Sequence, residues 1–309
     1  MKHNLRITFI LLAMFLVTQF IGLYVVNYYS TLKVINGTQV NVSAPTYPFG
    51  LEPPKVEKQT DYRDFFYGLV VSFIIAIFLL FILSKFKFAF ILKAWFFIVV
   101  VLALIVSFNV FTPKFSYSII AISLIALVLG YIKIYKRNLL VHNLTELLIY
   151  PGIAAILVPI FNLFWIIIFL ILISIYDMWA VWHSGIMQKM AKYQINQLQI
   201  FSGFFVPYLT KRVREKIANL KKLPKSKRKE QKIKVNIAIL GGGDVIFPTI
   251  AAGVMLKTLG LIPALCIIAG ATLGLSYLFI FAEKKKFYPA MPFITVGIFL
   301  GMFIGWMLF

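Results

Sequence analysis

The sequence is poor in charged residues, histidine and cysteine. Of its 309 residues only 13% are charged, three are histidine and one is cysteine. Soluble domains carry about 25% charged residues, so water is not the main solvent of this chain. The single cysteine, Cys266, excludes an intrachain disulfide and a cysteine zinc cluster. Three scattered histidines make no zinc site. We therefore expect neither a metal nor a cofactor.

Apolar residues are abundant instead, at 61% of the chain, and the mean hydropathy is +0.92. A helix that spans a membrane needs about 20 consecutive apolar residues. Nine runs approach that length, and they predict an all-α polytopic membrane protein with about nine transmembrane helices in one bundle. The runs cover residues 7–28, 65–83, 92–111, 115–132, 139–160, 163–183, 235–256, 259–282 and 289–309.

Two polar segments divide the chain into three parts. Residues 1–183 hold the first six predicted spans and a polar external loop at 29–64, residues 184–234 form a basic loop, and residues 235–309 hold the last three spans. The first apolar run is longer than the core of a signal peptide, and no small-residue cleavage site follows it. We interpret it as a retained first helix.

The formal net charge of +21 comes from 31 basic and ten acidic residues. In a membrane protein, lysine and arginine gather in cytoplasmic loops, which explains this charge without nucleic-acid binding. Most of the basic residues fall on one side if the N-terminus is cytoplasmic. The basic loop 184–234 is then cytoplasmic, beside anionic lipid headgroups, and the C-terminus is extracytoplasmic. A regulatory or substrate-docking role for this loop is the alternative.

Only three carboxylates fall within predicted spans: Glu146, Asp177 and Asp244. A charge at the centre of a membrane costs about 2.5 kcal/mol or more, which makes such residues functional candidates. Asp177 lies about six residues, or roughly 9 Å, from the cytoplasmic end of its span, and Asp244 about nine residues, or roughly 13 Å. Consecutive spans therefore place the two aspartates at similar depth. For Glu146 we favour an interfacial carboxylate paired with Lys136 or Arg137, with tuning of the aspartates as the alternative.

Three glycines, at 241–243, directly precede Asp244. Glycine allows another backbone to approach closely, and a glycine run inside a helix is costly. Pro248 removes a further helical hydrogen bond one turn later. The run therefore predicts a close contact or a loosened helix beside Asp244, although a tightly packed hinge with no catalytic role has the same pattern.

Two carboxyl groups at close range in a low dielectric cannot both ionise, so they share a proton. The ionised group can deprotonate a water, and the protonated group can polarise a peptide carbonyl and then protonate the leaving amine. This chemistry is that of an aspartic peptidase. Tyr176 is a candidate supporting residue, because its hydroxyl could orient the water or Asp177, although packing alone would also explain it.

Three motifs resemble those of the presenilin and signal peptide peptidase family of intramembrane aspartyl proteases, of the archaeal homologue type. They are Tyr176-Asp177 in the sixth span, Gly241-x-Gly243-Asp244 in the seventh, and Pro289-Ala290-Met291-Pro292 at the start of the ninth. The nine spans and the long loop after the sixth match as well. The chain departs from the family pattern at Met291, where leucine is usual.

The resemblance implies a presenilin-like fold and hydrolysis of peptide bonds within the transmembrane helices of substrates or signal peptides. It implies that Asp177 and Asp244 are the catalytic dyad and that Gly241 and Gly243 support them. It also implies that residues 289–291 shape the site and hold substrate. We further expect that the loosened segment after the sixth span could pair with the substrate as an added strand.

Three other interpretations stay open. A transporter or channel could use the same aspartates as a proton or cation relay, but the inverted repeats that would support it are not found. A prepilin-type peptidase also has a Gly-x-Gly-Asp motif, but the nine spans and the proline motif argue against it. An inactive family member acting as a membrane chaperone is disfavoured because both aspartates are present.

Overall fold

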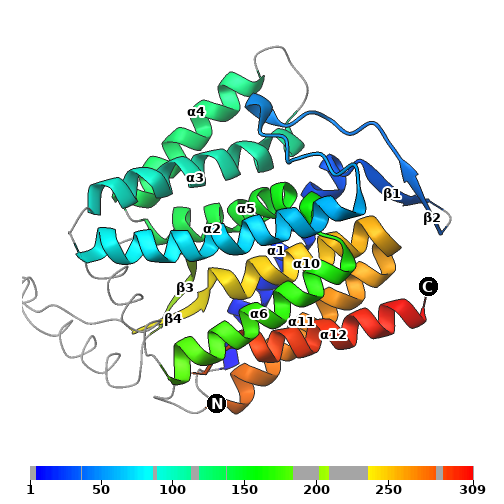
Figure 1. Cartoon of the computed structure of the whole chain (residues 1–309). Helices are drawn as coiled ribbons and strands as arrows, with labels where there is room; N and C mark the ends of the chain where they lie inside the picture. Colours follow the sequence, from blue (N-terminus) through cyan, green and yellow to red (C-terminus); the bar gives the residue numbers. More distant parts are fainter. Residues whose placement is uncertain are drawn as a thin grey trace, which may run out of the picture.

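The computed structural model describes residues 5–35, 37–85, 89–112, 118–136, 138–183, 202–208, 236–282 and 288–308. These residues form nine long helices in one bundle, as predicted (Figure 1). Eight apolar segments are long enough to cross a membrane, and the ninth helix is shorter, at 17 residues. The helices are α1 (Leu5–Tyr29), α2 (Gln59–Lys85), α3 (Ala89–Phe111), α4 (Ser118–Tyr131), α5 (Leu139–Leu157), α6 (Leu163–Trp182), α10 (Gly242–Leu259), α11 (Leu261–Phe281) and α12 (Met291–Met307).

The predicted start of the seventh span is wrong. Residues before Gly242 form a strand, β4 (Asn236–Gly241), which pairs antiparallel with β3 (Gly203–Tyr208). Apolar runs with β-branched isoleucines suit a strand as well as a helix, and hydropathy does not separate the two. The estimated depth of Asp244 is therefore wrong, because it assumed a helix from residue 235, whereas Asp244 lies in the first turn of α10. Of the basic segment 184–234, all but residues 202–208 lies outside the described residues.

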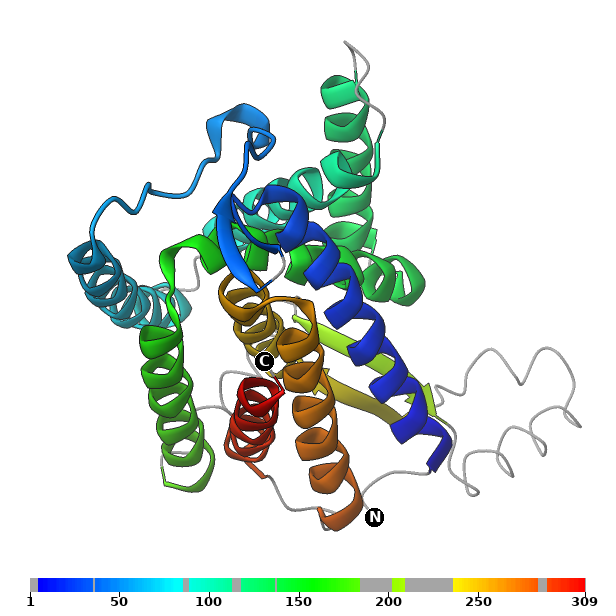
Figure 2. The ribbon, with the colours of Figure 1, turned by 90° about the vertical axis from the view of Figure 1, so that its right-hand side faces the viewer.

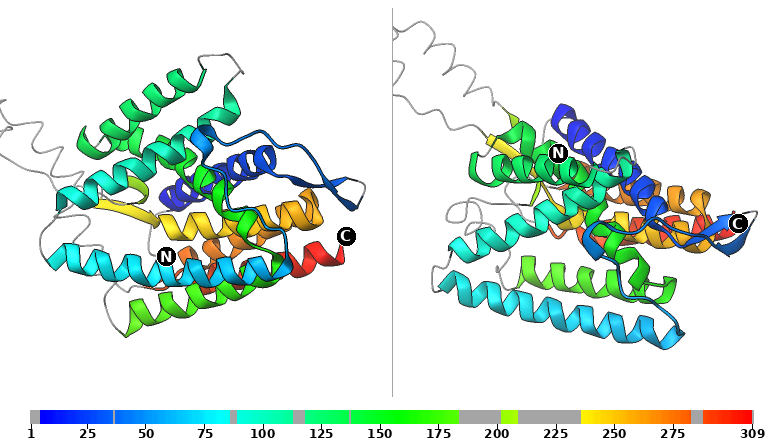
Figure 3. Two further views of the ribbon diagram at one scale, coloured as in Figure 1. Left: turned by 45° about the horizontal axis from the view of Figure 1, so that its top comes forward. Right: turned by 90° about the horizontal axis from the view of Figure 1, so that it is seen from above.

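At the centre of the bundle, α10 packs against α1, α5 and α11, and α1 also packs against α5 and α11. Small residues bring these helices close together: the Cα of Gly22 on α1 faces the side chain of Thr249 on α10. α12 lies between α6 and α11 (Figure 2). α2 and α4 lie at the periphery of the bundle (Figure 3), and most of their apolar side chains are exposed, as suits a lipid-facing position.

Side-chain caps fix the tight turn that joins α5 to α6. The Asn162 side chain accepts a hydrogen bond from the Trp165 N–H at 2.9 Å and begins α6. A 3-10 turn, Val158–Ile160, ends α5, and the Lys257 ammonium donates to the Val158 carbonyl at 2.9 Å. A cation at a helix C-terminus is favourable because the last carbonyls lack helical partners.

The two small sheets lie at opposite ends of the bundle (Figure 1). At the end away from β3 and β4, β1 (Leu32–Ile35) and β2 (Thr38–Asn41) form a hairpin that lies on the end of α10, where Gln39 donates to the Thr258 carbonyl at 3.0 Å. The loop that follows is held by the buried Tyr47, whose hydroxyl donates to the Ala155 carbonyl at 2.7 Å.

Candidate active site

Asp177 lies on the face of α6 that packs against α12, and its side chain is only 7% exposed. One carboxylate oxygen, Oδ2, accepts a hydrogen bond from the Met291 N–H at 3.0 Å. Met291 is the first residue of α12, where backbone N–H groups have no helical acceptor. The Pro-Ala-Met segment that the motif singled out therefore reaches Asp177 through its backbone.

A second contact fixes α6 against α12 one helical turn from Asp177. The hydroxyls of Ser174 and Thr295 are buried and lie 2.7 Å apart. This hydrogen bond and the Met291 contact attach α6 to α12 on either side of one turn. Pro289 and Met291 are buried, and Ala290 is half-buried. These residues shape the wall around Asp177.

Asp244 lies in the first turn of α10, immediately after β4, and is half-buried. α6 and α10 pack against each other, with Asp177 on one helix and Asp244 on the other. The two predicted catalytic residues thus lie on two helices that are in contact. Gly241 borders Asp244 directly, because a Cβ on Gly241 would lie 3.1 Å from the Asp244 Oδ2 atom.

The three glycines differ in what surrounds them. A Cβ on Gly242 would lie 2.6 Å from the Ser202 hydroxyl oxygen and 2.7 Å from the Tyr150 hydroxyl oxygen, so a side chain there would have to displace both. A Cβ on Gly243 would meet only the Phe247 ring, at an ordinary 3.4 Å. Of the three positions, Gly242 is therefore the one where close packing most requires glycine. In the Gly241-x-Gly243-Asp244 motif this position is the variable one.

Tyr176 points away from α12. Its ring is 37% exposed and packs edge-on against Phe73 of α2, with ring centroids 5.9 Å apart. The residues adjacent in the motif, Tyr176 and Asp177, therefore lie on different faces of α6. The described contacts of the Tyr176 ring are those of a packed aromatic residue.

A polar residue that the sequence reasoning missed supports α10 beside Asp244. Gln19 of α1 is fully buried and donates from Nε2 to the Val245 carbonyl at 2.9 Å. The Thr249 hydroxyl donates to the same carbonyl at 2.8 Å. Pro248 lacks an N–H, which weakens the hydrogen bonding of this turn, and Gln19 strengthens it from outside. An amide in the apolar run 7–28 was the signal available in the sequence.

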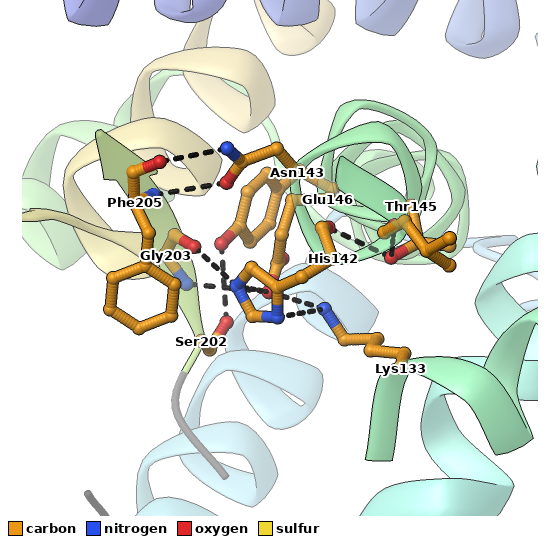
Figure 4. Close-up of polar contacts among 10 residues, drawn as sticks. Lys133, His142, Asn143, Thr145, Glu146, Ser202, Gly203 and Phe205 are labelled. Atoms are coloured by element: carbon orange, nitrogen blue, oxygen red, sulfur yellow. Dashed lines mark hydrogen bonds and ion pairs between the residues drawn. The ribbon is translucent and has the colours of Figure 1, made fainter. Parts of the chain in front are cut away.

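Glu146 has a different ion-pair partner from the Lys136 that the sequence suggested. Its side chain is fully buried inside the bundle, and its partner is Lys133, with 2.7 Å between Nζ and Oε1 (Figure 4). Lys133 belongs to the π-turn Ile132–Lys136 that extends α4, and this turn directs its side chain inward. The predicted partner Arg137 lies outside the described residues.

No group of three or more histidine, cysteine, aspartate or glutamate side chains gathers in a metal-binding cluster within the described ranges. The arrangement near Asp177 is thus a pair of carboxyl groups with backbone N–H donors beside them. Such a pair in an apolar bundle can hold one proton between its members and can act on a water or a polar bond that enters the site.

Comparison with known proteins bears on this site. A family model described as signal-peptide peptidase, presenilin aspartyl protease matches residues 31–309. No curated protein sequence matches the chain. A solved structure described as a presenilin family intramembrane aspartate protease in space group C222 is 17% identical, with a TM-score of 0.57 over 98% of this chain and 99% of the other. A second, described in the same words for space group P2, is also 17% identical, with a TM-score of 0.55 over 97% of each chain.

Proposed function

We propose, because this chain belongs to the signal-peptide peptidase and presenilin aspartyl protease family, that it hydrolyses peptide bonds within the transmembrane helices of substrate proteins or signal peptides. The observation that supports the proposal is the placement of Asp177 and Asp244 on α6 and α10, two helices that pack against each other. The substrates would be membrane-embedded helices reached through the lipid bilayer.

In the proposed mechanism, Asp177 and Asp244 share one proton, because two ionised carboxylates cannot coexist at close range away from bulk water. The ionised group takes a proton from a water, which attacks the peptide carbonyl. The protonated group polarises that carbonyl and then protonates the leaving nitrogen. The proton belongs to the pair, since the two groups titrate as one unit. The Met291 N–H holds Oδ2 of Asp177 and so orients its other oxygen.

A substrate helix must unwind before its peptide bond can reach the aspartates, and β4 offers the unwound segment a place. In the β3–β4 ladder, Ile237 and Ile239 direct their backbone N–H and C=O groups away from β3. Both side chains are exposed. An extended substrate segment can pair with this edge as an added strand. The edge runs through Gly241 to Asp244, so the added strand would end at the dyad.

β4 takes the place of the segment that the sequence suggested for strand addition. The segment after the sixth span supplies β3, whose other edge contacts α5. β4 is therefore the edge that we assign to the substrate.

The orientation in the membrane is also a proposal. The bias of lysine and arginine favours a cytoplasmic N-terminus and a cytoplasmic 184–234 segment, with the C-terminus outside. The β3–β4 sheet would then open toward the cytoplasm, and water would enter the site from that side.

Two measurements test this proposal. The purified protein in detergent should cut a synthetic transmembrane substrate, and mass spectrometry of the products should place the cut within the substrate's apolar segment. Ile239→Pro should then abolish or strongly reduce cleavage, because proline removes the outward N–H of β4 without removing a ladder bond to β3. Ile239→Val is the matched control. Equal activity of the proline and valine variants would refute strand addition at β4, and cuts confined to a soluble leader would refute cleavage within the membrane.

A further inference from the structure

A polar cluster from α4 and α5 faces β3 at the end of the bundle near Asp244 (Figure 4). It consists of Lys133, His142, Asn143 and Glu146, and three of the four are buried. Buried charged groups destabilise a bundle unless they are paired and hydrogen-bonded. Within the described residues, these four side chains make no direct contact with the two aspartates and are linked to them through the β3–β4 sheet. The placement of the cluster therefore needs another explanation.

The side chains of α5 bind the backbone of β3 in the pattern of a neighbouring strand. Asn143 donates from Nδ2 to the Phe205 carbonyl at 2.8 Å and accepts from the Phe205 N–H at 3.0 Å. His142 Nε2 lies 2.8 Å from the Gly203 carbonyl oxygen, and Glu146 Oε1 lies 3.3 Å from the Gly203 nitrogen. The outward N–H and C=O groups of both Gly203 and Phe205 are thus satisfied.

The register of the sheet explains why these two residues are the ones bound. Gly203 pairs with Gly241 and Phe205 with Ile239, at positions whose backbone groups point away from the partner strand. Pro207 occupies the next outward position, where the absence of an N–H costs no ladder bond. α5 therefore closes the outer edge of β3, and within the described residues the β4 edge is the open one of this two-stranded sheet.

The charges of the cluster hold the clamp in place. Because His142 Nε2 faces a carbonyl oxygen, Nε2 carries the proton and donates. Nδ1 then accepts from the Lys133 ammonium, 3.3 Å away. Lys133 also pairs with Glu146, through the same oxygen, Oε1, that accepts from the Gly203 N–H.

We infer that Asn143, His142 and Glu146 form a strand-mimicking clamp that positions β3, and through it β4 and Asp244, and that prevents a substrate strand from adding to the wrong edge of the sheet. These are positioning residues, and their effect on cleavage rests on the proposed protease function. The clamp sets where along a substrate the cut falls, because β4 is the template that presents the substrate to the dyad.

Asn143→Leu tests the clamp, since leucine keeps the volume and removes both hydrogen bonds to Phe205. Hydrogen exchange of residues 202–208 should rise by about tenfold or more, the ratio that two neutral hydrogen bonds are worth together. The ends of the cleavage products should shift or spread over several positions. Thr145→Val is the matched control, because within the described part of the chain the Thr145 hydroxyl bonds to carbonyls of its own helix. It should change neither readout.

A pair of double variants keeps the test valid if Asn143→Leu folds poorly. Lys133→Met with Glu146→Gln removes both charges but keeps an acceptor for the Gly203 N–H, whereas Lys133→Met with Glu146→Leu removes the acceptor as well. The first should keep the wild-type product ends, and the second should alter them and raise exchange at 202–208. Unchanged exchange in the second would overturn the clamp, and raised exchange with unchanged product ends would overturn its control of the cut. A wild type that cuts nothing would refute the proposed function instead, while exchange would still decide the clamp.

Discussion

Replacing Gly242 with alanine should displace the start of α10 from α5. The added Cβ would lie 2.6 Å from the Ser202 hydroxyl oxygen, 2.7 Å from the Tyr150 hydroxyl oxygen and 3.1 Å from the Tyr150 ring. Ser202 can rotate, but the Tyr150 ring is buried and cannot withdraw freely. The hydrogen bond between the two hydroxyls, 3.2 Å long, would have to break or lengthen.

The magnitude follows from two opposing contributions. Forcing an extra methyl into a packed core costs about 1 to 3 kcal/mol. Alanine gains at most about 1 kcal/mol over glycine in a helix, and less at the first turn. Gly242→Ala should therefore lower the free energy of unfolding by about 1 to 2 kcal/mol. Gly243→Ala is the control, because its Cβ makes an ordinary contact with Phe247, and it should be neutral or slightly stabilising.

Thermal unfolding in detergent, measured for both variants, separates the two glycines. Tyr150→Phe removes one of the clashing oxygens. Gly242→Ala should therefore destabilise the Tyr150→Phe variant less than it destabilises the wild type, with a coupling energy of about 0.5 kcal/mol or more. Cleavage activity should fall with Gly242→Ala, since Asp244 lies two residues further on in the same turn. Equal stability of Gly242→Ala and wild type, or a larger loss for Gly243→Ala, would refute this account of the glycine run.

Three further predictions concern the packing and charges of the bundle. Lys133→Met or Glu146→Leu alone should lower the free energy of unfolding by about 3 to 5 kcal/mol, because each leaves an unpaired buried charge, and the double variant should recover most of that loss. A double-mutant cycle by thermal unfolding measures the coupling, and additive losses would contradict the prediction. Gly297→Ala should destabilise by about 1 to 3 kcal/mol, because its Cβ meets the backbone of Gly270 where α11 and α12 touch. Gly68→Ala on α2, whose Cβ meets open space, is the control and should be neutral or slightly stabilising. Burial raises the pKa of the Tyr47 phenol in the folded protein. The stability that the neutral phenol contributes is therefore fully present below about pH 10 and is lost as the pH rises through the higher pKa of the folded state. Tyr47→Phe should lose stability less steeply than wild type at alkaline pH, and identical profiles would show that Tyr47 does not titrate on unfolding.

The helices and the two candidate aspartates could be predicted because both depend on local signals. Long apolar runs define the helices without any knowledge of their packing. Asp177 and Asp244 stand out because few carboxylates occur in such runs. The family motifs pointed to residues 289–291, and the backbone of Met291 does reach Asp177.

The features that escaped prediction depend on partners far away in the sequence. β4 is a strand because β3, about thirty residues earlier, supplies its hydrogen bonds, and hydropathy carries no record of that pairing. Lys133 reaches Glu146 because a π-turn at the end of α4 directs it inward, whereas counting from the loops favoured Lys136 or Arg137. The steric demand at Gly242 comes from Tyr150 and Ser202, two residues on other elements.

The most direct test of the central claim is cleavage of one transmembrane substrate by wild type, Asp177→Asn and Asp244→Asn, each purified in detergent and shown to be folded by the same thermal unfolding assay. Asparagine keeps the shape of aspartate but cannot share the proton. We expect the wild type to cut and both variants to be inactive while unfolding at temperatures near that of wild type. Cleavage by either folded variant at the wild-type rate would contradict the dyad. A folded wild type that cuts no transmembrane substrate would contradict the protease function and favour a proton or cation relay through the same aspartates.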